Sequence, residues 1–337
     1  MRILLILLLL SFQGYAQTYT LKQLSPAKNT SIRGLSVVSD QVAWVSGSKG
    51  YVGKSLDGGQ TWEWMQPKGF EDLDFRDIQA FDDQQAVIVN AGSPAYVLLT
   101  KDGGKSWSQQ YMNRDSLIFL DGMDFWDRKN GMIFGDPIKE KMQLLRTADG
   151  GASWQDVTSK LKFKMNLGEA GFAASGTSIK MMSKGKVWIA TGGSVSNIYF
   201  SKNHGKSWSK YPCPIMQGEN STGAFSVDFY DDKNGVVVGG NYLKDTDNSN
   251  NVLITSDGGK TWSRPKAPVF GFRSAVVYVN KATLIAGGSS GLDISSDAGQ
   301  TWQHLSDANI NAAGKATSGS LVLLTGNKGE IYTLTSL

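Results

Sequence analysis

The hydrophobic and polar positions along the chain form short apolar runs separated by turn residues. No stretch places its apolar residues at the 3.6-residue spacing of an amphipathic helix. Short runs bounded by glycine, asparagine, aspartate and serine are typical of strands joined by tight turns. In the first repeating stretch we expect four strands, at residues 35–38, 42–46, 51–55 and 61–65. The pattern therefore predicts an all-β chain.

One octapeptide recurs six times along this pattern, and each copy ends in tryptophan. The acidic or amide residue and the tryptophan of the six copies are Asp57 and Trp62, Asp102 and Trp107, Asp149 and Trp154, Asn203 and Trp208, Asp257 and Trp262, and Asp297 and Trp302. Successive tryptophans are 45, 47, 54, 54 and 40 residues apart. This spacing is typical of one four-stranded blade per repeat, not of a helical solenoid.

The octapeptide has a mechanical explanation as a hairpin turn. Its aspartate can accept hydrogen bonds from the backbone N–H groups that follow it, and glycine adopts a positive φ without steric cost. The second glycine is present in all six copies, whereas His204 and Ala298 replace the first in two of them. We therefore expect the second glycine to occupy the strict positive-φ position and the tryptophan to cover the hairpin.

The end of the chain sets the number of blades. After Trp302, three more strands are expected at residues 310–317, 320–325 and 330–334, without a seventh octapeptide. Residues 18–24, ahead of the first repeat, supply an unassigned strand. Pairing the two ends would close the ring and remove its exposed edges. We predict one seven-bladed β-propeller domain over residues 17–337, closed by the N-terminal strand; six blades with the tail outside the ring is the alternative.

The first sixteen residues have the pattern of an export signal. Met1 and Arg2 precede an unbroken run of eight apolar residues, and the small residues Gly14 and Ala16 follow. This order is typical of a secretory signal peptide cleaved near Ala16. The run is too short to cross a bilayer, which takes about 20 apolar residues, and no later segment is long or apolar enough. The sequence predicts a periplasmic or secreted protein without a membrane span.

Composition and charge exclude several classes of function. Lys and Arg number 34 against 30 Asp and Glu, a net charge of +4 that does not favour nucleic acid as a partner. One cysteine, Cys213, and two histidines, His204 and His304, leave little for a disulfide framework, a metal centre or a His-dependent catalytic triad. We therefore expect no cofactor and no metal. A monomer is the expected oligomeric state.

The octapeptide resembles the Asp-box (BNR) repeat of sialidases and related propellers. The whole chain after its leader resembles the photosystem II stability/assembly-factor-like propellers. In that superfamily the box lies on the blade periphery and is structural, so the resemblance implies that the six boxes carry no chemistry. Because the assembly-factor relatives act by binding other proteins, the resemblance implies a non-catalytic binding or assembly module.

A binding site is expected at the mouth of the central channel, which the first strand of each blade lines in a propeller. Aligning the first strands by their distance to the box places Arg33, Arg76 and Arg273 at nearly equivalent positions in blades one, two and six. Asp121, Asp124 and Glu169 come from blades three and four. Because guanidinium groups bind oxyanions through two hydrogen bonds, the six residues predict a site for a protein, a glycan or a small anion. The alternative is that these charges pair with one another and join the blades.

Two enzymatic alternatives remain open. Sialidases, which the boxes resemble, combine an arginine triad with a Tyr–Glu nucleophile pair and an acid/base aspartate, so the arginines also fit a glycoside hydrolase. The Phe/Tyr-Arg-Ile-Pro motif of sialidases is missing, and residues 75–78 are its nearest trace. Some relatives are labelled oxidoreductases, a less favoured function because the sequence has no dinucleotide-binding loop and no haem attachment motif.

Overall fold

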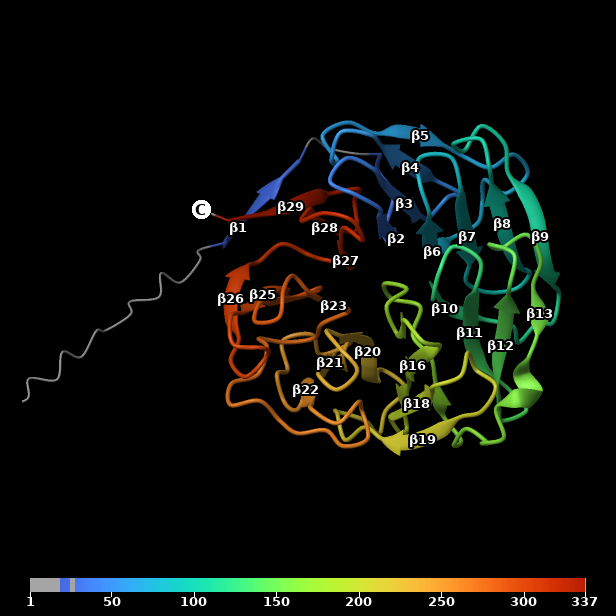
Figure 1. Ribbon diagram of the computed structural model, residues 1–337. Helices are drawn as coiled ribbons and strands as arrows, with labels where there is room; N and C mark the ends of the chain where they lie inside the picture. Colours follow the sequence, from blue (N-terminus) through green and yellow to red (C-terminus); the bar gives the residue numbers. More distant parts are fainter. Residues whose placement is uncertain (1–18, 25–27, 337) are drawn as a thin grey trace, which may run out of the picture.

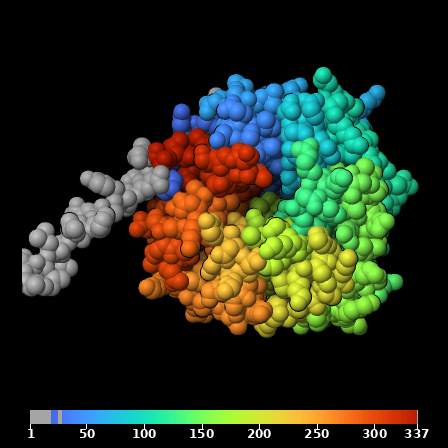
Figure 2. All heavy atoms as spheres, viewed as in Figure 1, coloured from blue at the N-terminus to red at the C-terminus, as the bar shows by residue number. Residues whose placement is uncertain are grey.

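The structure is a computed structural model that describes residues 19–24 and 28–336. Seven small antiparallel sheets are arranged as a ring around a common centre (Figure 1). Seen from the same side, the blades follow one another around this centre as successive coloured sectors (Figure 2). The predicted seven-bladed β-propeller is confirmed. The proposed signal peptide lies outside the described residues.

Blades one to three each contain four strands, numbered from the channel outward. Blade one is β2 (Ile32–Val37), β3 (Ala43–Gly47), β4 (Val52–Ser55) and β5 (Glu63–Met65); blade two is β6 (Phe75–Ala80), β7 (Ala86–Asn90), β8 (Ala95–Thr100) and β9 (Ser108–Asn113); blade three is β10 (Leu120–Phe125), β11 (Gly131–Ile138), β12 (Lys141–Thr147) and β13 (Gln155–Asp156). A short 3-10 turn, η1 (Thr158–Lys160), follows blade three.

Blades four to six continue the ring in the same order. Blade four is β15 (Ile179–Met182), β16 (Lys186–Ala190), β18 (Asn197–Ser201) and β19 (Ser209–Pro212); blade five is β20 (Thr222–Phe229), β21 (Gly235–Asn241) and β22 (Val252–Thr255), joined by the short strands β14 (Glu169–Ala170) and β17 (Gly192–Gly193); blade six is β23 (Ala275–Tyr278), β24 (Leu284–Gly288), β25 (Gly291–Ser295) and β26 (Gln303–Ser306). Blade five differs from the predicted four-strand pattern, because a single bridge between Ile254 and Ser263 replaces its outer strand. Pro265, two residues later, has no N–H to extend that ladder.

The seventh blade joins the two ends of the chain. It contains β27 (Ala312–Lys315), β28 (Val322–Thr325) and β29 (Ile331–Ser336), and the N-terminal strand β1 (Tyr19–Gln23) completes it. β1 and β29 are antiparallel over five residue pairs, from Tyr19 opposite Ser336 to Gln23 opposite Tyr332. The hydroxyl groups of Thr20 and Thr335 lie 2.9 Å apart and share a hydrogen bond. The predicted closure by the N-terminal strand is confirmed.

The first strand of blade four lies later in the chain than predicted. Alignment by distance to the box placed it at Glu169, but the inner strand is β15, and Glu169 lies on the short strand β14. Distance to the box fails here because an insertion, residues 171–178, runs between β14 and β15. In Figure 1 this yellow-green segment lies inside the ring, between β10 and β23.

The hydrophobic core consists of layers between neighbouring blades. One layer packs Met132 and Phe134 of blade three against Ile179 and Val187 of blade four, all of them buried. Equivalent layers separate the other blades, because the alternating side chains of each strand point to both faces of its sheet. The core therefore encircles the channel, and the inner strands leave their ends free to carry polar groups.

The Asp boxes form the hairpins between the third and fourth strands. In the first box, the Asp57 carboxylate accepts hydrogen bonds from the Thr61 N–H at 2.9 Å and the Thr61 hydroxyl at 2.6 Å. The Trp62 indole donates to the Gly59 carbonyl at 3.0 Å. Five of the six tryptophans make this bond; the Trp107 indole N–H has no partner among the described residues. The boxes close hairpins at the blade periphery.

Both glycine positions of the box have positive φ, which corrects the expectation that only the second does. At the first position His204 and Ala298 have φ values of 58° and 60°. The second position differs in its surroundings: a Cβ on Gly151 would come within 2.6 Å of Val87, and one on Gly205 within 2.5 Å of Met132. The second residue is therefore glycine in every copy because it packs against the core of the preceding blade.

The described residues contain no helix with the length and apolar character that a membrane crossing requires. Within the same ranges no three or more His, Cys, Asp or Glu side chains are grouped as metal ligands would be. The single cysteine, Cys213, is buried with a free thiol, and burial raises its pKa to about 12.

Candidate functional site

A β-bulge at the start of the inner strands decides which side chains face the channel mouth. In blade one, Ile32 pairs with Gly47 and Gly34 pairs with Ser46, so Arg33 is the extra, unpaired residue. The same irregularity leaves Arg76, Asp121 and Phe225 unpaired in blades two, three and five. A bulge turns its extra side chain away from the ladder. Of these four residues, Arg33, Arg76 and Phe225 line one cavity, whereas Asp121 is buried.

Arg33 and Arg76 lie side by side at the mouth. Arg76 Nε donates to the Asp74 carboxylate at 2.7 Å, and the Arg76 guanidinium stands 5.9 Å from the centre of the Phe119 ring. Arg33 forms no ion pair with any described residue; one of its N–H groups donates to the Ala174 carbonyl at 3.0 Å. Burial and the neighbouring Arg76 lower the pKa of Arg33, while Asp74 opposes them. Arg33 thus brings to the site a positive charge that has no ion-pair partner among the described residues.

Residues 171–177, here called the plug loop, close the channel below the two arginines. The Ala173 carbonyl accepts a hydrogen bond from Arg76 at 3.4 Å, and the Ala174 carbonyl accepts the hydrogen bond from Arg33. On the far side, Ser175 Oγ donates to the Ser274 carbonyl at 2.7 Å. Since the loop comes from blade four and binds blades one, two and six, it spans the channel and forms the floor of a cavity at the mouth.

Asp121 lies beneath the start of the plug loop. It is almost fully buried, and neither of its carboxylate oxygens has a hydrogen-bond donor among the described residues. Burial and the adjacent Asp136 carboxyl raise the pKa of Asp121 well above its usual range. Asp136 accepts the Gly171 N–H at 2.8 Å. Asp121 thus lies against Gly171 without a hydrogen bond to the loop, and Asp136 is the carboxylate that lines the cavity.

The structure does not bring Arg273 to this cavity. Its side chain is fully buried and forms an ion pair with Asp293, at 2.7 Å, inside blade six. The reason is a difference of one residue in register. The Phe272 carbonyl approaches Gly288 in blade six as the Phe119 carbonyl approaches Gly135 in blade three. Counted from these carbonyls, Ser274 and not Arg273 takes the position that Arg33 holds in blade one. Such a one-residue shift reverses the side to which a strand residue points.

Asp124 and Glu169 are also structural in their contacts. The Asp124 carboxylate accepts the N–H of Met181, at 2.6 Å, and so joins blade three to blade four; burial raises its pKa to about 6. The Glu169 carboxylate is buried and accepts hydrogen bonds from Thr191, Asn197 and Tyr199. For these two residues the contacts match the alternative in which charges join the blades.

Sequence reasoning missed the aromatic side of the cavity. Phe225 is the bulged residue of blade five, and Phe172, Tyr242 and Phe272 line the cavity with it. The sequence does contain a signal for this aromatic side. Phe225 and Phe272 lie within the first-strand segments of blades five and six that were aligned by their distance to the box. Aligning these strands on the glycine opposite the bulge, instead of on the box, would have found Phe225 in the position of Arg33.

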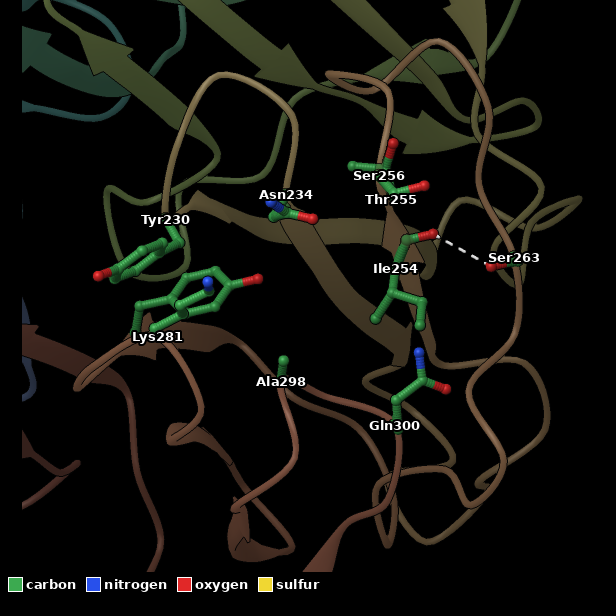
Figure 3. Close-up of a pocket in the computed structure, with 11 residues that line it drawn as sticks. Tyr230, Asn234, Ile254, Thr255, Ser256, Ser263, Lys281, Ala298 and Gln300 are labelled. Atoms are coloured by element: carbon green, nitrogen blue, oxygen red, sulfur yellow. Dashed lines mark hydrogen bonds between the residues drawn. The ribbon is translucent and has the colours of Figure 1, made fainter.

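The mouth cavity has a volume of about 520 Å³. A smaller cavity of about 230 Å³ lies at the periphery between blades five and six, where Tyr230, Lys281 and Gln300 surround it (Figure 3). Lys281 is the one charged residue among the described residues that line it. Because charged and aromatic groups converge at the mouth, the mouth cavity is the better candidate for a functional site.

Comparison with known proteins agrees with the propeller fold. A family model described as photosynthesis system II assembly factor YCF48 matches residues 16–116. The structure of YCF48 bound to D1 peptide superposes with a TM-score of 0.65 at 18% identity, covering 96% of each chain. This chain is a BNR propeller similar to the photosystem II assembly factors. YCF48 from Cyanidioschyzon merolae gives a TM-score of 0.64 at 15% identity, over 93% of this chain and 98% of that one.

This assembly-factor-like propeller shares its fold with enzymes as well. The glycoside hydrolase family 74 xyloglucanase from Xanthomonas campestris superposes with a TM-score of 0.61 at 14% identity, over 94% of this chain and 53% of that one. At such identity the likeness shows the fold alone. No curated protein matches the sequence.

Proposed function

We propose that this chain is an exported, non-catalytic binding module, active as a monomer, that holds an anionic segment of a partner protein at the channel mouth. The observation that carries the proposal is the Arg33–Arg76 pair, in which Arg33 has no carboxylate partner among the described residues. A half-buried guanidinium without a counter-ion binds a carboxylate strongly, because a charge-assisted hydrogen bond then replaces the incomplete hydration of its charge. The D1 peptide in the YCF48 structure supports a peptide as the ligand class.

The carboxylates of the cavity fit binding better than sugar hydrolysis. A retaining glycosidase needs two carboxyl groups about 5 Å apart, both reaching the substrate. Of the described residues that line the cavity, Asp136 is the one carboxylate, and Asp121 lies buried beneath Gly171. The leader at residues 1–16 supports export, which would bring the mature domain, residues 17–337, to a periplasmic or extracellular partner.

Peptide selection tests the proposal. A random heptapeptide library is selected on the immobilised wild-type protein and on the Arg33→Ala/Arg76→Ala variant, and a selected peptide is then titrated by fluorescence anisotropy. We expect wild type to enrich Asp and Glu, the variant to bind the peptide at least about tenfold more weakly, and added salt to weaken wild-type binding. Equal binding by both proteins, or turnover of a fluorogenic sialoside by wild type, would contradict the proposal.

The third arginine supplies the matched control. Arg273→Met removes the guanidinium from the buried Asp293, whose remaining partners are the Phe270 N–H and the His304 ring; breaking such a buried ion pair costs about 3–5 kcal/mol of stability. Urea unfolding should therefore separate the arginines: Arg273→Met lowers the free energy of unfolding more than the Arg33→Ala/Arg76→Ala variant does, which loses about 1–3 kcal/mol with its two hydrogen bonds to the plug loop.

A further inference from the structure

The mouth cavity has two chemically different walls. Arg33 and Arg76 come from blades one and two. Phe225 and Tyr242 come from blade five, and Phe272 from the approach to blade six. In a ring of seven, blade five faces blades one and two across the channel, as the positions of β20, β2 and β6 show (Figure 1). A cationic wall therefore faces an aromatic wall.

The aromatic wall is a packed cluster with one open edge. Phe172 stacks on Phe225 with ring centres 3.8 Å apart and planes 14° apart, and Phe272 meets Phe225 edge-on at 4.7 Å. Phe225 and Phe272 are buried, whereas Tyr242 is 48% exposed at the rim, with its ring centre 6.1 Å from that of Phe225. Such a wall needs no rearrangement to accept an apolar group, and Tyr242 is its accessible contact.

The plug loop makes the cavity blind. Ala173 and Ala174 line the mouth cavity, while Ser175 and Gly176 line a separate cavity on the other side of the loop. A ligand that enters from the mouth cannot pass through. It therefore contacts the cationic wall and the aromatic wall within the same space of about 520 Å³. That space suits one or two side chains with their backbone.

We propose that the cavity selects a carboxylate directly adjacent to an aromatic or long aliphatic group, an inference that rests on the binding function proposed above. In a protein partner this is an acidic residue next to an aromatic or aliphatic one. The carboxylate binds Arg33 and Arg76, and the apolar group packs on Tyr242 and Phe172. An anion without an apolar neighbour leaves the aromatic wall hydrated, and an apolar group without an anion leaves Arg33 unpaired.

Competition between two simple carboxylates tests the inference. The fluorescent probe anilinonaphthalene sulfonate, itself an aromatic anion, is bound to the protein and displaced by acetate or by phenylpropanoate. We expect phenylpropanoate to compete at least about tenfold better than acetate for wild type, as burial of a phenyl group predicts. In Tyr242→Ser this ratio falls by about fivefold or more. Tyr230→Ser is the matched control, because Tyr230 has a similar exposure, 44%, and lies far from the mouth cavity, beside the peripheral one.

The outcomes separate this inference from the proposed function. Equal competition by the two carboxylates, absence of dye binding to wild type, or an unchanged ratio in Tyr242→Ser would overturn the inference. If Arg33→Ala weakens both carboxylates while Tyr242→Ser changes neither, the inference falls and the binding function stands. If Arg33→Ala leaves both unchanged, the proposed function itself falls.

Discussion

At the scale of single residues, what an arginine does depends on one step of register. Arg33 and Arg76 occupy bulges and reach the cavity, whereas Arg273 stands one position earlier and is buried against Asp293. Arg33 and Arg273 both lie 24 residues before the aspartate of their box, yet they differ in register by a margin of one residue. In a strand, where successive side chains point to opposite faces, that margin separates a ligand contact from a structural ion pair.

The box aspartates predict an acid-sensitive step in stability. Hydrogen bonds from Ser106 lower the pKa of Asp102 to about 2, and those from Thr261, which outweigh burial, lower the pKa of Asp257 to about 2. An aspartate in the unfolded chain has a pKa of about 3.9. Because the folded pKa is lower, these bonds stabilise the protein fully above pH 4 and are lost as pH falls towards 2.

The test is urea unfolding of wild type and of Asp102→Asn/Asp257→Asn between pH 2 and pH 5. The wild-type midpoint should fall over this range, and the midpoint of the variant should fall less, because asparagine does not titrate. The fourth box shows that asparagine fits: Asn203 accepts the Ser207 N–H at 3.0 Å. Asp72→Asn, at an exposed position outside the boxes, is the control. Parallel curves for the double variant and wild type would contradict this account.

At the scale of elements, the plug loop turns an open channel into a blind cavity. Residues 171–177 contribute no strand, yet they contact Arg33, Arg76 and Ser274 from three different blades. Gly176 lets the loop pass close to blade two, with φ at 74° and a virtual Cβ only 2.4 Å from the Asp77 carboxyl. The loop is therefore held in place by contacts that are distant in sequence.

Gly176→Ala should destabilise the protein more than a glycine substitution in open space. Gly69 is the matched control, because its φ is 86° and nothing lies within 4 Å of its virtual Cβ. Both variants place a Cβ on a backbone with positive φ, at a cost of about 1–2 kcal/mol, while Gly176→Ala adds about 1–3 kcal/mol from overlap with Asp77. Urea unfolding measures the difference. Equal losses in the two variants would show that the loop yields without cost.

At the scale of the whole molecule, stability depends on joining two ends that lie more than 300 residues apart in the chain. β1 and β29 are held by a five-pair ladder, and the Thr20 and Thr335 hydroxyls share a hydrogen bond across it. An unpaired β29 would leave an edge strand exposed. The ring is thus closed by main-chain pairing, not by a covalent link.

A disulfide in place of the Thr20–Thr335 pair should stabilise the ring. The oxidised Thr20→Cys/Thr335→Cys variant is expected to gain about 2–4 kcal/mol in free energy of unfolding, because the cross-link restricts the unfolded chain. The native thiol, Cys213, is buried and does not compete. The same variant with reductant, and the single Thr20→Cys variant, should unfold like wild type. If oxidation brings no gain, the ring does not unfold by opening at this seam.

The amino-acid sequence by itself determined the repeat, the hairpin boxes and the closed ring of seven blades, because these follow from local turn chemistry and from the need to cover strand edges. It also picked out Arg33 and Arg76 as mouth residues. Only the tertiary structure decided that Arg273 and Glu169 are buried, that the plug loop closes the channel, and that an aromatic wall faces the arginines. Those features depend on register and on contacts between blades far apart in the chain, and spacing along a sequence carries neither.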